Sequence, residues 1–539
     1  MRTYAVPARG TLPAPQQIEI EWLSEPPILT TEMQRMMSYL ESNSHRTPPV
    51  PDAPVARLHP TSAPQDSPAA VPLTHLPNDT RDFVYEFYQG PGGFNSQVGE
   101  PSIGANGGVF FITNNWYAAV SANYGKDWSF VNPFVVGNAD AGFCCDQKAI
   151  YVPQFDLMIW ILQTIENGTQ NRYRMVVFRR LSDLTTATYH FYDITPAIFG
   201  LNATAPNKWL DFPDIQFTNN RLYLTANVFT VTANTFADAL VASFDLNQMA
   251  AADQVNFSYG TIFNGPGAGR IGTASNRLTS GADDSTMHIF GHLTTSSVRI
   301  YTWTDADVLT SVDRSLGTTW ADPTTCPGIG GDPCGRLDAR PTAAFRANGG
   351  KEIVMGWSSG PIAPFPNVHM KFARFTTASP NNLVTVNEIW GNTFHYYYGS
   401  GGTNGRGHGG GTVQRHSASN HPECGFWMMD DVSGHVPGVG LVITASDWTP
   451  NISGDYLESR PYYPHDDVWA GTCINYFGGF SVDYSAVIFG RTRDMPPFVR
   501  GDVSDNQAPP LPRLLPSDVN IDPERARASE RARVTEQNR

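Results

Sequence analysis

The chain has 539 residues, of which 41% are hydrophobic and 12% aromatic, so it can bury a sizeable core. Only 16% of the residues are charged, and the formal net charge is −14. An acidic chain lacks the concentrated basic patch that nucleic acids and anionic membranes attract. No apolar run reaches the roughly 18 residues of a spanning helix. We therefore expect no nucleic-acid partner and no membrane span.

The first 80 residues differ in composition from the rest. Residues 30–43, TTEMQRMMSYLESN, place three methionines near one face of a short amphipathic helix within an N-terminal tail, residues 1–46. Nine prolines in residues 47–77 predict an extended linker over residues 47–80. The helix would dock on a protein assembly partner or on the chain's own domain, or the tail would be a frayed end without a partner.

Residues 81–498 read as one β-strand after another. GGVFFITNN (107–115), DLMIWILQ (156–163) and KEIVMGW (351–357) are short, β-branched and aromatic, and Gly, Asn, Asp or Pro bound most such runs. No long segment keeps a helical period. The sequence therefore predicts one all-β domain, followed by a Pro-rich and Arg/Glu-rich C-terminal tail over residues 499–539.

The predicted strands form a repeat of an approach strand, a turn and a strongly apolar strand. Radial repetition of four-stranded units is a β-propeller. We predict six blades, with seven as the alternative, and expect residues 83–89, FVYEFYQ, to close the ring. The six openings begin at Glu100, Cys145, Phe212, Ala274, Arg340 and Cys424.

The stretch SANYGKDW, residues 121–128, resembles the Asp-box (BNR repeat) of sialidase-type propellers, which runs Ser-x-Asp-x-Gly-x-Thr-Trp. Ser121, Asn123, Gly125 and Trp128 match, with Asn in place of Asp. The resemblance implies a turn in which a short polar side chain binds the backbone, Gly takes a permissive dihedral and Trp packs on the blade. This motif is structural and implies no catalysis.

Most of residues 95–495 also resemble a group of uncharacterised, mostly secreted bacterial propellers. GFCCDQKAIYVPQFDLMIWILQ and SRPYYPHDDVWAGTCINYFGGF carry the similarity. The resemblance implies the fold and an extracellular or particle-surface setting. The N-terminus shows no apolar signal segment, which argues against that setting.

Six cysteines predict three disulfides in an oxidising compartment, with six reduced thiols as the alternative. Cys326 and Cys334 share a Gly/Pro loop, which leaves Cys424 for Cys473 and the adjacent pair for each other. That pair, Cys144 and Cys145, opens a blade beside Asp146. A bond between adjacent cysteines forms a flat, rigid platform for a sugar or aromatic ring, or a turn lock, or a redox centre. Tyr396 and Tyr397 would suit sugar stacking equally well.

Resemblance to sialidases implies three arginines that bind the carboxylate of the substrate. It also implies a tyrosine nucleophile paired with a glutamate, and an aspartate that acts as the acid. The sialidase Arg-Ile-Pro signature is absent from this chain. Surface or inter-blade ion pairs are the alternative for the arginines. The candidates are Arg270, Arg340, Arg460, Tyr463 and Asp146.

Metal sites are predicted only weakly. His408, His416 and His421 lie in a Gly-rich segment without a recognised ligand spacing. Asp pairs in residues 281–285, 429–434 and 464–469 would supply oxygen ligands to a structural Ca²⁺, or simply form hairpin turns.

The sequence is compatible with three functions. The leading one is an extracellular propeller that binds a glycan or other surface ligand at the propeller mouth without catalysis. The alternatives are a sialidase-like glycoside hydrolase and a decorating subunit of a larger assembly, docked through its N-terminal arm. Fold alone does not choose among them.

Overall fold

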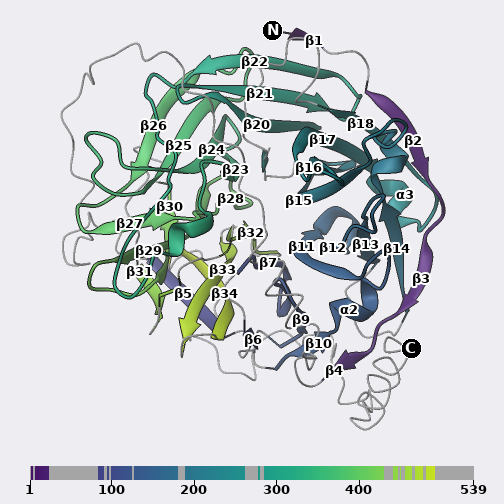
Figure 1. Ribbon diagram of the computed structural model, residues 1–539, viewed down its shortest axis with the longest axis horizontal. Coiled ribbons are helices and arrows are strands. Elements are labelled where there is room, and N and C mark those ends of the chain that lie inside the picture. Colours follow the sequence, from purple (N-terminus) through teal and green to yellow (C-terminus); the bar gives the residue numbers. More distant parts are fainter. Residues whose placement is uncertain are drawn as a thin grey trace.

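The computed structural model is a ring of seven antiparallel β-sheets around a central axis (Figure 1). Adjacent sheets contact one another in sequence order, and the seventh contacts the first, so the ring is closed. The structure describes residues 2–3, 7–23, 83–89, 94–95 and 99–491, except 124, 126, 180–187, 262–276, 280–284, 430–440, 447–448, 451–453, 455, 464–467 and 478–480.

Blades 1–4 each begin with a strand near the axis and step outwards through three more strands. Their strands are β7 (Ser102–Asn106), β8 (Val109–Thr113), β9 (Ala118–Ser121) and β10 (Ser129–Val131) in blade 1; β11 (Phe143–Val152), β12 (Leu157–Thr164), β13 (Tyr173–Phe178) and β14 (Thr188–Ile194) in blade 2; β15 (Lys208–Phe217), β16 (Arg221–Thr230), β17 (Phe236–Asp245) and β18 (Val255–Thr261) in blade 3; and β19 (Arg277–Leu278), β20 (Thr286–Thr294), β21 (Ser297–Thr304) and β22 (Leu309–Ser315) in blade 4.

Blades 5–7 complete the ring, and blade 7 takes its outer strand from an earlier part of the chain. Their strands are β23 (Pro341–Ala347), β24 (Glu352–Ser359), β25 (His369–Thr376) and β26 (Leu383–Ile389) in blade 5; β27 (Phe394–Tyr397), β28 (Gly402–Thr403), β29 (Gly409–Ser417), β30 (Glu423–Met428) and β31 (Leu441–Ala445) in blade 6; and β32 (Ser459–Pro461), β33 (Trp469–Phe477), β34 (Ser481–Arg491), β5 (Phe83–Gln89) and β6 (Phe94–Asn95) in blade 7.

The all-β propeller is confirmed, with seven blades, the alternative in the sequence analysis, rather than the favoured six. Two features of the chain explain the difference. The opening assigned to Cys424 is the third long strand of blade 6, whose first strand begins at Phe394. Blade 7 opens with only three residues, Ser459–Pro461, too short to show a strand pattern. Residues 83–89 do close the ring, because β5 pairs with β34.

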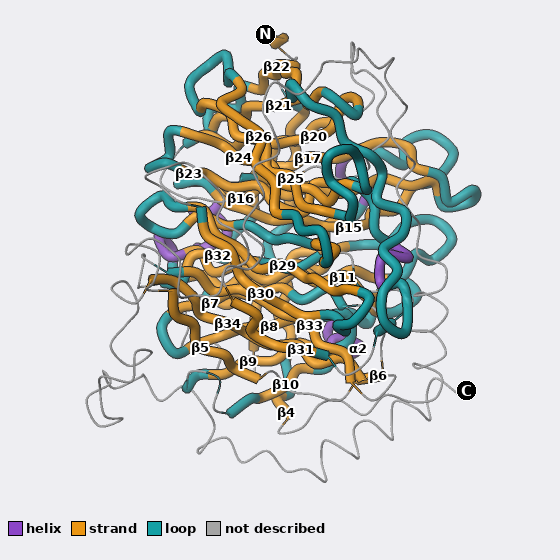
Figure 2. The backbone as a smooth tube through the Cα atoms, turned by 90° about the vertical axis from the view of Figure 1, so that its left-hand side faces the viewer, coloured by secondary structure: helices purple, strands orange, loops and turns teal. Residues whose placement is uncertain are grey.

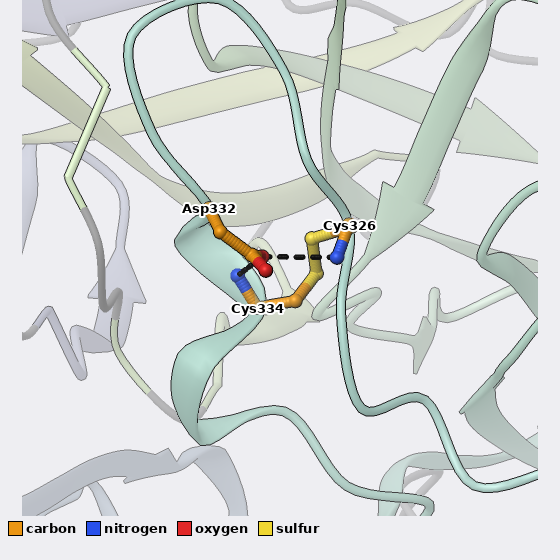
Figure 3. A group of neighbouring side chains, drawn as sticks. All are labelled: Cys326, Asp332 and Cys334. Carbon is orange, nitrogen blue, oxygen red and sulfur yellow. Dashed lines mark hydrogen bonds between the residues drawn. A yellow bond between two sulfur atoms is a disulfide. The ribbon is translucent and has the colours of Figure 1, made fainter.

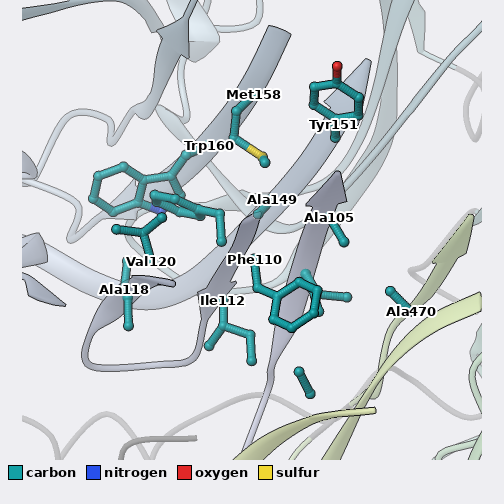
Figure 4. Packing of buried hydrophobic residues seen from close by; sticks show 14 of the residues in the cluster. Ala105, Phe110, Ile112, Ala118, Val120, Ala149, Tyr151, Met158, Trp160 and Ala470 are labelled. Atoms are coloured by element: carbon teal, nitrogen blue, oxygen red, sulfur yellow. The ribbon is translucent and has the colours of Figure 1, made fainter. Parts of the chain in front are cut away.

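The core lies between the blades. All eight residues of β12 are buried, and alternate side chains point to opposite faces of a strand. Met158, Trp160 and Leu162 pack in a cluster with blades 1 and 7, part of which Figure 4 shows. Leu157 and Ile159 pack in a second cluster with blade 3. Burial on both faces explains the unbroken apolar run of this strand.

The N-terminal segment forms a strap around the outside of the ring. Its four strands are antiparallel additions to blades 4, 3, 2 and 1 in that order, and Figure 1 shows them along the outer rim. In the side view of Figure 2, the last of them lies beside β10. The strap strands are β1 (Arg2–Thr3), β2 (Ala8–Leu12), β3 (Gln16–Glu19) and β4 (Trp22–Leu23).

Buried side chains anchor the strap. Leu12 is fully buried in the cluster of blades 2 and 3. The Trp22 indole N–H donates to the Tyr189 hydroxyl at 2.8 Å. The described part of the predicted N-terminal tail therefore docks on the chain's own domain. The predicted helix (30–43), the linker (47–80) and the C-terminal tail (499–539) lie outside the described residues.

Short helices connect the strands. In the described residues no helix is long and apolar enough to cross a membrane. The helices are α2 (Pro133–Val136), η3 (Pro153–Phe155), η5 (Pro196–Phe199), α3 (Leu246–Ala250) and η6 (Pro333–Arg336).

The turn between β9 and β10 contains the four residues that match an Asp-box. The Ser121 Oγ accepts from the Gly125 N–H at 2.8 Å, and the Asn123 Oδ1 accepts from the Asp127 N–H at 2.9 Å. Gly125 has a φ of 74°, in the left-handed region that favours glycine. Trp128 packs against the core of blades 1, 2 and 7. Asn thus supplies the carbonyl acceptor that this turn needs.

Candidate functional site

The six cysteines form three disulfides, and Cys144 is bonded to Cys145. The adjacent pair lies at the start of β11, the first strand of blade 2, where a β-bulge separates Cys144 from Gln147. Cys145 has a φ of 37°, which is uncommon for a residue other than glycine. The bond is thus part of an irregular strand start near the axis of the ring.

Blade 3 repeats this irregularity. The first strand, β15, has a bulge between Asp211 and Asp214, and Phe212 within it has a φ of 51°. Bulges redirect side chains at functional sites. Two neighbouring first strands therefore present an aspartate, Asp146 and Asp211, from equivalent irregular starts.

The two aspartates influence each other electrostatically. Burial, followed by the negative charge of Asp146, raises the pKa of Asp211 to about 7. A hydrogen bond from the Gln163 Nε2 to the Asp211 Oδ1, 3.1 Å long, and the Arg340 charge oppose this rise only in part. Asp211 can therefore carry a proton near neutral pH.

A row of side chains crosses blade 2 toward these aspartates. Cys144 on β11 is opposite Gln163 on β12, which is opposite Tyr173 on β13. Gln163 and Tyr173 are buried, yet the Gln163 Oε1 and the Tyr173 Oη have no hydrogen-bond partner among the described residues. Burial and the charges of Asp211 and Asp146 raise the pKa of Tyr173 well above its usual value. Buried polar atoms without a protein partner can bind a water molecule or a polar atom of a ligand.

We call this group the blade 2/3 site, and Asn171 bounds it. The Asn171 side chain donates to the Leu210 carbonyl at 2.7 Å and accepts from the Leu210 N–H at 2.8 Å, which fixes β15 against blade 2. The blade 2/3 site consists of Cys144, Cys145, Asp146, Gln163, Tyr173 and Asp211.

A chain of aromatic and cationic contacts extends from the site across the centre of the ring. The rings of Phe212 and Tyr456 meet edge to face at 5.5 Å. The Arg340 guanidinium lies 4.6 Å from the Phe212 ring centroid, and the Lys148 Nζ lies 3.3 Å from that of Tyr456. The Tyr456 hydroxyl donates to the Gln147 carbonyl at 3.3 Å. These contacts fix one edge of the blade 2/3 site.

The predicted arginine triad is not assembled from the described arginines. Arg340 makes two 2.7 Å hydrogen bonds to Asp338. Arg460 lies 3.5 Å from Glu458 and donates to the Ile215 carbonyl at 3.4 Å. Each of these two arginines therefore pairs with a buried carboxylate two residues away in the chain, which is neither the surface nor the inter-blade ion pair given above as the alternative. Arg270 lies outside the described residues.

The predicted tyrosines lie elsewhere in the ring. Tyr463 packs against Tyr151, with ring centroids 6.0 Å apart, and forms a backbone bridge to Asn106 of blade 1. Tyr396 and Tyr397 are buried in β27 of blade 6, so neither offers an open ring face for a sugar. The structure thus brings Asp146 and the cysteine pair together and leaves these tyrosines apart.

The predicted histidines do not converge on a common point. The His416 Nε2 is 2.5 Å from the Cys326 carbonyl oxygen, and the His421 Nδ1 is 2.7 Å from the Thr449 hydroxyl. Burial, with the neighbouring His395, lowers the pKa of His416 to about 4. His408 joins no cluster of metal-ligand atoms among the described residues.

One cluster of ligand atoms does occur in the described residues, and it contains a disulfide. Cys326, Cys334 and Asp332 place their side-chain atoms within 4.8 Å of one another. Figure 3 shows that the sulfurs are bonded and that Asp332 accepts from the backbone N–H groups of both cysteines. Bonded sulfurs are not thiolate ligands. The Asp pairs considered for Ca²⁺, at 283–284, 430–431 and 466–467, lie outside the described residues.

Comparisons with known proteins found no matching family model and no matching curated protein. Solved structures share the general architecture. A Penicillium chrysogenum α-L-arabinanase with bound arabinobiose has a TM-score of 0.37 at 9% identity, over 77% of this chain and 99% of that chain. A Fusarium graminearum α-L-arabinofuranosidase, Arb93A, has a TM-score of 0.35 at 11% identity, over 75% and 97%. A Trypanosoma rangeli sialidase has a TM-score of 0.33 at 11% identity, over 64% and 54%.

Proposed function

We propose that this protein is an extracellular propeller that binds a neutral carbohydrate at the blade 2/3 site. The observation that carries the proposal is the pair of buried, unpaired polar atoms, Gln163 Oε1 and Tyr173 Oη, beside two aspartates. Sugars present several hydroxyls at short spacing, and each can donate to an amide or carboxylate oxygen. The Cys144–Cys145 bond would supply the rigid apolar surface on which the sugar ring rests.

The charge at the site favours a neutral sugar over an acidic one. Asp146 and Asp211 contribute negative charge, whereas Arg340, whose charge acts on Asp211, is already bonded to Asp338. A ligand carboxylate would meet like charge without a free bidentate partner. The extracellular part of the proposal rests on the three disulfides, which are typical of oxidising compartments.

Glycoside hydrolysis is a second candidate, and one observation favours it. Glycosidases use one carboxylic acid with a raised pKa and a second carboxylate that stays ionised. The raised pKa of Asp211 beside Asp146 fits that division of roles. In this case Asp211 would protonate the leaving oxygen, and Asp146 would act as base or nucleophile.

A neutral-glycan array tests binding. The wild-type protein and Gln163→Leu are compared with the control Gln154→Leu. Gln154 joins the same two blades beyond the opposite end of β11, through a 2.9 Å bond to the Thr218 carbonyl. We expect a defined set of neutral glycans to bind the wild type and the control and to lose at least tenfold in affinity with Gln163→Leu. If Gln163→Leu bound the glycans as tightly as the wild type, the blade 2/3 site would not be the binding site.

Released reducing sugar, measured on each bound glycan, separates the two candidates. A pure binder releases none. A hydrolase releases sugar with the wild type, and Asp211→Asn abolishes the release while binding persists.

A further inference from the structure

A cavity lies between blades 4 and 5, and its lining is separate from the blade 2/3 site. Its volume is about 240 Å³, which is comparable to one sugar ring and its first waters. One wall is the sheet of blade 4, and the other is the loop that follows β25, residues 377–381. None of the residues that line it belongs to the blade 2/3 site.

The wall from blade 4 is a regular array of side chains on one sheet face. His288, Thr302 and Thr310 are Cα partners across β20, β21 and β22. Thr286 and Thr304 form a parallel row two residues away and therefore point to the same face. Neighbouring strands place such groups about 5 Å apart, and residues two apart about 7 Å.

Two hydroxyls of this array, those of Thr302 and Thr310, are available to a ligand, whereas the Thr304 hydroxyl accepts from the Val308 N–H at 3.3 Å. Thr302 and Thr310 make no side-chain hydrogen bond to another described residue, although Thr310 is largely buried. The lining residues carry seven hydroxyls, the His288 imidazole and the Asn381 amide, and no carboxylate, ammonium or guanidinium. The methyl groups of threonine, with Val312 and Pro380, supply apolar contact in the same place.

Two arginine side chains hold the two walls in position. The Arg314 side chain of β22 donates to the carbonyls of Asn381, at 2.9 Å, and of Pro380. The Arg346 Nη2 donates to the Thr286 carbonyl at 2.8 Å and fixes β20. Both guanidinium groups thus donate to backbone carbonyls. These bonds fix the walls of the cavity before any ligand enters.

We propose that this cavity is a second binding site, specific for a neutral polyol of about one pyranose ring. Uncharged donors and acceptors at sheet spacing match the hydroxyls of a pyranose, and the absence of charged lining groups disfavours ionic ligands. With the blade 2/3 site it would let one propeller engage two points of a glycan, which raises avidity without a new contact. The proposal stands independently of the function of the blade 2/3 site.

The test uses the full chain and the methyl glycosides of glucose, galactose, mannose and arabinose, followed by saturation-transfer NMR and titration calorimetry. Thr302→Val with Thr310→Val keeps the side-chain shape and removes two hydroxyls. Ser379→Tyr, at the exposed rim, fills the cavity without touching the core. Thr385→Val on β26 is the matched control outside the cavity, and Gln163→Leu disables the other site.

We expect at least one glycoside to bind the wild type, Thr385→Val and Gln163→Leu equally. The same glycoside should bind the double valine variant and Ser379→Tyr at least tenfold more weakly. Binding that is lost only in Gln163→Leu assigns the sugar to the blade 2/3 site and overturns this proposal. Unchanged binding in Ser379→Tyr, or no glycoside bound by the wild type, also overturns it.

Discussion

Gln163 donates its side-chain N–H to the Asp211 carboxylate at 3.1 Å and so joins the second strand of blade 2 to the first strand of blade 3. The oxygen of the same amide, Gln163 Oε1, has no partner among the described residues. One side chain therefore both closes an inter-blade contact and presents an unused acceptor beside two aspartates.

Asp211 should make the protein less stable as the pH rises. Its pKa is about 7 in the folded protein and 3.8 in the unfolded reference, so the folded state binds the proton more tightly. The stability it contributes is complete below about pH 4 and is lost as the pH rises through about 7. Denaturant titrations give the free energy of unfolding at pH 5 and at pH 8. The decrease from pH 5 to pH 8 should be smaller for Asp211→Asn than for the wild type. Equal losses would contradict the raised pKa.

The buried pair of Lys148 and Glu458, 2.9 Å apart, should be costly to break. Both side chains are almost fully buried, so Glu458→Gln removes the nearest negative charge from Lys148 and should cost about 3–5 kcal/mol of unfolding free energy. Glu458 also lies 3.5 Å from the buried Arg460, so adding Lys148→Met should restore only part of that loss. As a control, Arg9→Gln breaks a pair with Asp307 in which the arginine side chain is 68% exposed, and it should cost about 1 kcal/mol or less. A Glu458→Gln loss no larger than the control's would contradict the burial of this pair.

The strap should stabilise the ring mainly through Leu12. This side chain is fully buried, and Leu→Ala in such a position costs about 2–5 kcal/mol. Gln16→Ala, at an exposed strap position, should change the unfolding free energy by no more than about 0.5 kcal/mol. The measurement is chemical denaturation of both variants. Equal free energies of unfolding for Leu12→Ala and Gln16→Ala would show that the strap does not pack as described.

The Cys424–Cys473 bond should stabilise the closure of the ring. It links β30 of blade 6 to β33 of blade 7 across 49 residues. Removal of a cross-link over a loop of this length costs about 4 kcal/mol in the chain-entropy account. The double alanine variant should therefore lose several kcal/mol. A variant as stable as the wild type would mean that the link is absent from the native protein.

The sequence predicted the propeller because its strands repeat with short turns, and residues 83–89 were predicted to close the ring for the same reason. It favoured six blades over the seven kept as the alternative, because Ser459–Pro461 is too short to show a pattern. The strap was not predicted, because β2 and β3 are edge strands whose exposed residues show little apolar alternation. Edge pairing is decided by the backbone of the neighbouring blade rather than by the strand's own side chains.

The candidate site was predicted in part. Cys144, Cys145 and Asp146 stood out because adjacent cysteines are unusual, whereas Gln163, Tyr173 and Asp211 are ordinary residues in apolar strands. A signal for Asp211 was present, since CDQ at 145–147 and FPD at 212–214 open consecutive blades in the same way. Superposing those openings would have pointed to the residue preceding Phe212. The inter-blade contact of Gln163 could not be predicted, because it depends on the angle between two blades.

The most direct test of the proposed function is a crystal structure of the protein with the neutral glycan that binds it most tightly on the array. We predict a sugar ring against the Cys144–Cys145 bond, with hydroxyls within hydrogen-bond distance of the Gln163 Oε1 and of Asp211. A glycan bound elsewhere on the ring, with the blade 2/3 site unchanged, would contradict the account.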